Sequence, residues 1–155
     1  MKALAERWGV GDKTITRAIA ELQRDGLVVA LGRGQRPVVA RWWARHPTDN
    51  IAIATGPAGL VVVDLDQTRP GDRPPADRPG ATGGADVLDQ LADQHGQTLT
   101  ATWTVQTASG GRHRYYRAPK GAGLRNTAGR AGWKIDTRAG GGYVVAAGST
   151  VAGRP

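Results

Sequence analysis

Two aspartates separated by one leucine, Asp64 and Asp66, have the types and spacing of residues that bind a cation. They end an apolar run at residues 59–63 that contains three valines and predicts a strand buried on both faces. Because side chains alternate along a strand, both carboxylates point to the same face. Mg2+ and Mn2+ prefer such oxygen ligands and would offset the repulsion between the two charges. The alternative is a strand that ends in an ordinary acidic turn.

Two further segments carry residues that complement this pair. The turn at residues 109–111 leads directly to His113, and Asp136 lies near the end of another predicted strand. If these strand ends meet, three carboxylates would surround one or two divalent cations, as phosphoryl transfer from a nucleotide requires. The glycines of the turn allow the backbone to approach a phosphate, and His113 can donate a hydrogen bond to it.

The composition limits the class of protein. The 155 residues carry a net charge of +8, which favours nucleic acid as a partner through phosphate attraction. The absence of cysteine excludes disulfides and thiolate zinc sites and fits a reducing compartment. No apolar run approaches the ~20 residues that span a bilayer, so we expect a cytoplasmic protein without membrane contact.

The remaining elements follow from periodicity and from turn residues. Residues 67–84 are rich in proline and glycine and predict a loop, whereas residues 85–95 predict an amphipathic helix. The other predicted strands are residues 50–55, 102–107, 113–117, 133–138 and 143–147, and residues 118–131 are predicted as loop.

Residues 1–39 resemble a winged helix-turn-helix of the GntR type. They contain a short helical segment, a glycine break, a helix with i, i+3, i+4, i+7 apolar spacing at residues 13–25, and a basic hairpin. The resemblance implies that the second helix and the wing contact duplex DNA. The implied DNA-binding residues are Lys13, Thr14, Thr16, Arg17, Arg33 and Arg36. A structural helical hairpin without a DNA role is the alternative.

Residues 42–150 resemble a second family, the bifunctional DNA primase/polymerase domain of the archaeo-eukaryotic primase superfamily. The matching motifs are Trp43-x-x-x-Pro47-x-x-Asn50-Ile51, Thr55-Gly56, Gly59 to Asp66, Thr107-x-Ser109-Gly110-Gly111-x-His113, Ile135-Asp136-Thr137-Arg138 and Gly141 to Ala146. They occur in the family's order and at comparable spacing.

This second resemblance implies a role for each site residue. Asp64, Asp66 and Asp136 would be catalytic metal ligands for Mg2+ or Mn2+, and His113 would contact the incoming nucleotide. The other implied nucleotide-binding residues are Ser109, Gly110, Gly111 and Arg138. The implied fold is α+β, an RRM-like core with a mixed sheet flanked by helices.

We therefore expect a partial winged helix at residues 1–39 and a truncated primase/polymerase core at residues 40–155. The expected function is metal-dependent, template-directed nucleotidyl transfer that makes primers for a plasmid or an integrated element. The partners would be single-stranded DNA template, nucleoside triphosphates, duplex DNA at the winged helix, and a helicase. The alternatives are a GntR-like transcriptional regulator that carries an inactive primase relic, and an accessory protein that binds nucleic acid without turnover.

Overall fold

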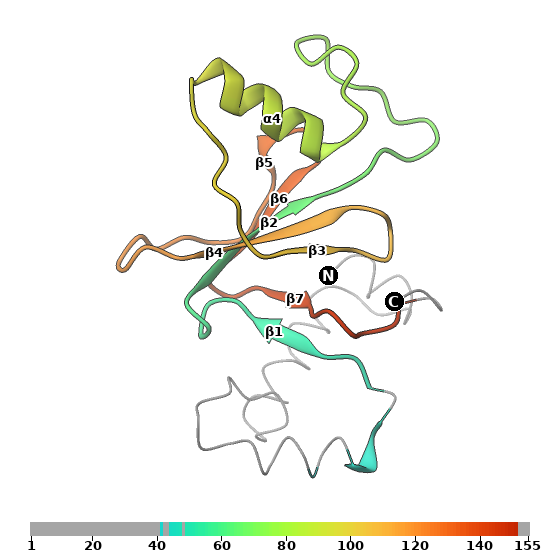
Figure 1. The fold of residues 1–155 in the computed structure, drawn as a ribbon, viewed down its shortest axis with the longest axis vertical. Coiled ribbons are helices and arrows are strands. Elements are labelled where there is room, and N and C mark those ends of the chain that lie inside the picture. Colours follow the sequence, from blue (N-terminus) through green and yellow to red (C-terminus); the bar gives the residue numbers. More distant parts are fainter. Residues whose placement is uncertain (1–40, 42–43, 48, 152–155) are drawn as a thin grey trace. The chain divides into compact units, whose positions relative to one another are not determined.

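The computed structural model describes residues 41, 44–47 and 49–151 (Figure 1). The interpretation of residues 1–39 as a partial winged helix lies outside these residues, as do the side chains predicted to contact duplex DNA. Those side chains are Lys13, Thr14, Thr16, Arg17, Arg33 and Arg36. Within the described ranges, no helix has the length and apolar character needed to cross a membrane.

The strands form two sheets in the described part of the chain. Their bounds are β1 (Ala52–Ala54), β2 (Leu60–Leu65), β3 (Thr104–Gln106), β4 (Arg112–Arg117), β5 (Thr127–Gly132), β6 (Ile135–Arg138) and β7 (Tyr143–Val145). The larger sheet has the order β3-β4-β2-β6-β5, and β1 pairs with β7 in the smaller one. Every pairing between these strands is antiparallel.

Strand β2 lies at the centre of the larger sheet, and its apolar residues are covered on both faces. It pairs with β4 along one edge and with β6 along the other. Val62 is fully buried on one face, and Leu65 is only 2% exposed on the other. The run of valines predicted as a buried strand therefore forms the middle of the sheet.

Helix α4 (Gly84–Gln94) covers one face of this sheet. Its buried Val87 packs with Leu65 of β2, Ile135 of β6 and Ala81 of the preceding loop. The apolar residues at helical spacing thus form the buried stripe that the sequence predicted. The surrounding contacts come from Val63, Ala85, Leu88, Leu91 and Trp133.

The start of α4 is fixed by a short polar network and by a glycine. The backbone N–H and the hydroxyl of Thr82 both donate to Asp86 Oδ2, at 2.7 and 2.6 Å. Gly84 lies so close to the carbonyl group of Lys134 that a β-carbon at this position would overlap it. The helix can therefore approach the sheet at this point only if residue 84 has no side chain.

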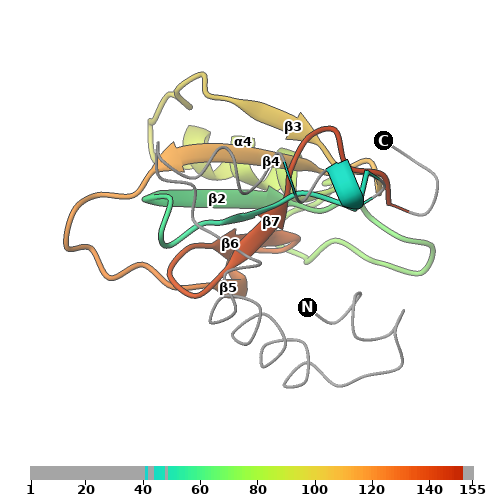
Figure 2. The same ribbon diagram turned by 90° about the horizontal axis from the view of Figure 1, so that it is seen from below.

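The small sheet of β1 and β7 lies on the opposite side of the larger sheet from α4 (Figure 1). Figure 2 views the molecule from the side of β7 and has α4 behind the larger sheet. The fully buried Thr55 fixes this arrangement, because its hydroxyl donates to the Ala139 carbonyl at 2.6 Å and its N–H donates to the Gly142 carbonyl at 3.0 Å. These bonds join the end of β1 to the turn between β6 and β7.

The α+β class is confirmed, but two of the sequence predictions are wrong. The larger sheet is antiparallel rather than mixed, and in the described residues a single named helix covers one face while β1 and β7 cover the other. Residues 127–131, which belong to the predicted loop at 118–131, lie in β5 instead. This strand lacks apolar alternation and is mostly exposed, so its extended conformation depends on irregular pairing with β6.

We expect Gly84→Ala to lower the free energy of unfolding by about 1–3 kcal/mol, because the added methyl group forces α4 away from the Lys134 carbonyl. Urea denaturation of the full chain measures this change. The control is Asp89→Ala on the exposed part of the same helix, which should change stability by less than about 0.5 kcal/mol. Equal unfolding midpoints for Gly84→Ala and wild type would show that the contact between α4 and the turn before β6 is not tight.

Candidate active site

Three polar side chains stand in a row across the centre of the larger sheet. Asp64 on β2 is the direct partner of His113 on β4 and of Asp136 on β6. Direct cross-strand partners project to the same face. The next residue, Leu65, points into the core under α4, so the row lies on the face away from that helix.

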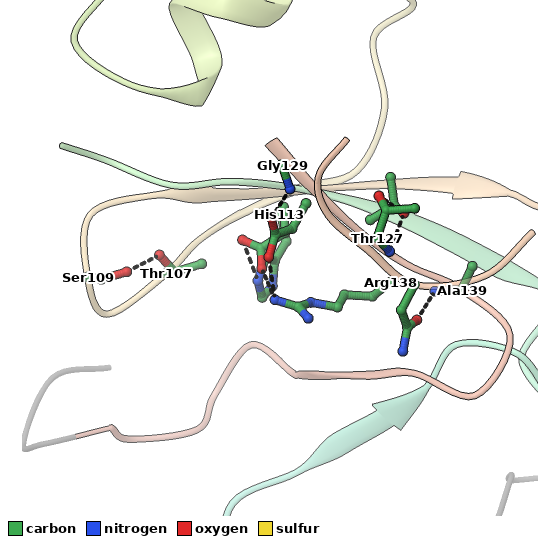
Figure 3. Close-up of polar contacts among 11 residues, drawn as sticks. Thr107, Ser109, His113, Thr127, Gly129, Arg138 and Ala139 are labelled. Atoms are coloured by element: carbon green, nitrogen blue, oxygen red, sulfur yellow. Dashed lines mark hydrogen bonds and ion pairs between the residues drawn. The ribbon is translucent and has the colours of Figure 1, made fainter. Parts of the chain in front are cut away.

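The row is connected by an arginine from β6 (Figure 3). Arg138 Nη2 lies 3.2 Å from Asp64 Oδ2 and 3.0 Å from Asp136 Oδ2, so one nitrogen bridges the two carboxylates. On the far side, His113 Nε2 is 3.4 Å from Asp64 Oδ1. The second oxygen of Asp136 accepts the N–H of Gly129 at 2.9 Å. Both oxygens of each aspartate therefore have a partner.

The electrostatics of Asp64 follow from these contacts. Burial raises the pKa of this carboxyl, but interactions with His113 and Arg138 lower it by more, so its pKa lies below the ordinary value. Its side chain is only 13% exposed. Asp64 is thus an ionised carboxylate held inside the sheet by contacts with Arg138 and His113.

Asp66 is positioned through its backbone at the end of β2. Its N–H donates to the Lys134 carbonyl at 2.9 Å, and its carbonyl accepts the N–H of Gly84 at 2.8 Å. These two bonds fix the end of β2 between the turn before β6 and the start of α4. By the alternation of the strand, the Asp66 side chain belongs to the same face as Asp64.

The charge at Asp66 is incompletely balanced. Burial raises its pKa, and the negative charges of Asp64 and Asp136 raise it further. Lys134 and Arg69 oppose this rise only in part. The end of β2 is therefore a region of excess negative charge, which a bound cation would relieve.

The three carboxylates suit a hard divalent cation by chemical type. In the part of the chain that the structure describes, however, no three carboxylate or imidazole groups are arranged to hold a metal ion. The guanidinium of Arg138 lies between Asp64 and Asp136 instead. The assignment of Asp64, Asp66 and Asp136 as metal ligands stays a prediction.

The predicted glycine turn lies next to the end of β2. It is closed by hydrogen bonds from Thr107 N–H to the Gly111 carbonyl and from Gly110 N–H to the Thr107 carbonyl, at 2.9 and 2.8 Å. The hydroxyls of Thr107 and Ser109 are 3.0 Å apart (Figure 3). A β-carbon on Gly111 would come within 2.5 Å of the Leu65 carbonyl, so glycine is needed for this approach.

The sequence reasoning missed two features of this face. It did not predict that Arg138 bridges two of the predicted ligands, although the spacing of Asp136 and Arg138 places both on one face of a strand. It also did not single out Tyr115, two residues after His113. Among the described residues, His113 Nδ1 and the Tyr115 hydroxyl are buried without a hydrogen-bond partner, and the two rings meet edge to face at 6.3 Å.

Comparison with known proteins identifies the family to which this arrangement belongs. The model of the family described as bifunctional DNA primase/polymerase, N-terminal, matches residues 20–155. No curated protein and no solved structure matches the chain. The family's members act on DNA with nucleotides and typically use divalent metals. The chain therefore belongs to the bifunctional DNA primase/polymerase N-terminal family, whose members are DNA primase/polymerase nucleotidyltransferases.

Proposed function

We propose that this chain catalyses metal-dependent, template-directed nucleotidyl transfer and makes primers for replication of a plasmid or an integrated element. One observation carries the proposal: Asp64, His113 and Asp136 lie side by side on three adjacent strands of one sheet face. Such a row presents two acidic groups and an imidazole to one ligand from rigid backbone positions. The strands and helix α4 would form the RRM-like core that the family resemblance implies.

In this proposal the carboxylates of Asp64, Asp66 and Asp136 hold Mg2+ or Mn2+. When bound, the cation would neutralise charge that develops on the triphosphate and on the attacking oxygen. The protein contributes the fixed spacing of the three side chains, set by the β2–β6 register and by the backbone bonds of Asp66. Excess negative charge at Asp66 favours cation binding there.

His113 is proposed to bind the triphosphate of the incoming nucleotide. Its Nε2 faces Asp64, whereas Nδ1 is buried and has no partner among the described groups. A neutral imidazole has one N–H, so it cannot donate to Asp64 and to a phosphate at the same time. Binding of the phosphate would therefore either replace the contact with Asp64 or use both ring nitrogens as donors.

The turn at Ser109, Gly110 and Gly111 is proposed to approach the phosphates. Gly110 has a φ of 87° and is partly exposed, whereas Gly111 is buried against the end of β2, so the backbone of Gly110 is the part of the turn that a phosphate could approach. The Ser109 hydroxyl contacts only Thr107 among the described residues, and it is exposed. Arg138 would contact the triphosphate or the template.

Asp64→Asn should reduce incorporation of labelled nucleotides on a single-stranded template by about 1000-fold, because it removes a ligand charge without changing the shape of the side chain. Affinity for the template alone should stay within about twofold. The matched control, Asp89→Asn, makes the same change on the exposed part of α4 and should keep activity. Activity of Asp64→Asn near the wild-type level would contradict the proposal.

Asp66→Asn should raise the melting temperature at pH 7 by about 2 °C in the presence of a chelator. Because the pKa of Asp66 is raised in the folded state, ionisation lowers stability as pH rises above its ordinary value near 3.8. Asparagine removes this cost, so the gain should disappear at pH values below about 4. A lower melting temperature than that of wild type at pH 7 would show that Asp66 is not under electrostatic strain.

The N-terminal residues are proposed to bind duplex DNA as a partial GntR-type winged helix. This proposal rests on the sequence pattern of residues 1–39 and on the net charge of +8. The family match begins at residue 20, inside this stretch, so residues 20–39 are open to both interpretations.

The affinity for duplex DNA should fall with rising salt, with a negative slope of log affinity against log salt. Replacing both Arg33 and Arg36 by alanine should make this slope less steep by about 1.8, if each residue contacts one phosphate. Fluorescence anisotropy over a range of salt concentrations measures this slope. A slope equal to that of wild type would remove the proposed wing from the DNA-binding surface.

A further inference from the structure

Arg138 uses a single nitrogen, Nη2, to contact both aspartates that face each other across β2 and β6. The two distances, 3.2 Å to Asp64 and 3.0 Å to Asp136, lie within the range of ordinary N–H···O hydrogen bonds, here between oppositely charged groups. The arginine side chain is 27% exposed, and the two carboxylates are 13% and 20% exposed. The contact is therefore partly shielded from solvent but can be reached by a small ion.

The remaining oxygens of the two carboxylates face groups on the strands. Asp64 Oδ1 faces His113 at 3.4 Å, and Asp136 Oδ1 accepts the backbone N–H of Gly129. The Oδ2 atoms, which both face Arg138, are thus the oxygens that a shared ligand can reach. A cation that bridges Asp64 and Asp136 must take the position of the guanidinium nitrogen.

Asp66 gives a divalent cation an advantage over the arginine. Arg138 forms ion pairs with Asp64 and Asp136, and none of the ion pairs between described residues joins it to Asp66. The guanidinium therefore pairs with two of the three acids and leaves the third to another cation. A divalent ion carries twice the charge and can contact all three.

We propose that Arg138 occupies the position of the catalytic cation and competes with it for Asp64 and Asp136. If Asp64, Asp66 and Asp136 held the divalent ion, Arg138 would lose both ion pairs. Its guanidinium would then be free to contact the triphosphate. This inference rests on the proposed function, because it takes the three aspartates as the metal ligands.

The competition is tested by measuring Mn2+ binding to the full chain by electron paramagnetic resonance, without nucleotide. Arg138→Gln should bind Mn2+ about fivefold or more tightly than wild type, since the ion no longer has to displace a partly buried ion pair. The matched control is Arg112→Gln, which removes the same charge from an exposed position on β4. Arg112 is the register partner of Leu65, so it lies on the face of the sheet opposite to Asp64. The affinity of Arg112→Gln for Mn2+ should therefore stay within about twofold of wild type.

The outcomes separate this inference from the proposed function. Suppose that Asp64→Asn abolishes Mn2+ binding, but that Arg138→Gln binds Mn2+ no more tightly than wild type. This result overturns the competition and still supports the metal site. An equal increase in affinity for Arg112→Gln and Arg138→Gln also overturns it, because the effect is then one of net charge alone. If neither wild type nor Arg138→Gln binds Mn2+ in a manner that depends on Asp64, both the competition and the proposed metal site are wrong.

A second measurement is made on the wild-type protein, and a variant serves only to assign the signals. The side-chain NMR signals of Arg138 in wild-type protein are assigned by their absence from Arg138→Lys, and Mg2+ is then titrated. While Arg138 is paired with the two aspartates, rotation about its Cζ–Nε bond should be slow. Saturation with Mg2+ should restore the fast rotation of an unpaired arginine. Unchanged slow rotation at Mg2+ saturation would overturn the proposal even if Arg138→Gln does not fold.

Discussion

The register of β2 with β6 places two negative charges, Asp64 and Asp136, directly opposite each other. Like charges in direct cross-strand positions destabilise a sheet, and these carboxylates are largely shielded from water. The fold is therefore compatible with this register only when a cation lies between them. Arg138 supplies that cation from within the chain, and the account of the site depends on this one interaction.

The rest of the structure keeps that register in place. Helix α4 covers the far face of the sheet through Val87, and its close approach at Gly84 requires a residue without a side chain. On the other side, the buried hydroxyl of Thr55 ties β1 to the turn after β6. Because both layers hold β2 rigidly, the spacing of the acidic side chains is set by backbone hydrogen bonds rather than by flexible loops.

The sequence predicted the elements with strong local signals and missed those set by long-range pairing. The valine run before Asp64, the helix at residues 85–95 and the turn before His113 were recognisable because periodicity and glycine placement are local properties. Strand β5 was missed because its residues carry no apolar pattern, and the antiparallel order of the sheet was missed because alternation does not reveal which strands pair. The bridging position of Arg138 depends on that pairing, so it could be seen only in three dimensions.

The central claim is that Asp64, Asp66 and Asp136 form one divalent-cation site that Arg138 otherwise fills. A crystal structure of the protein soaked in Mn2+, with anomalous scattering measured at the manganese edge, tests it most directly. The account predicts one or two anomalous peaks within coordination distance of the three carboxylates, with Arg138 turned away from Asp64 and Asp136. Peaks elsewhere, or none at saturating Mn2+ with Arg138 still bridging the two aspartates, would contradict it.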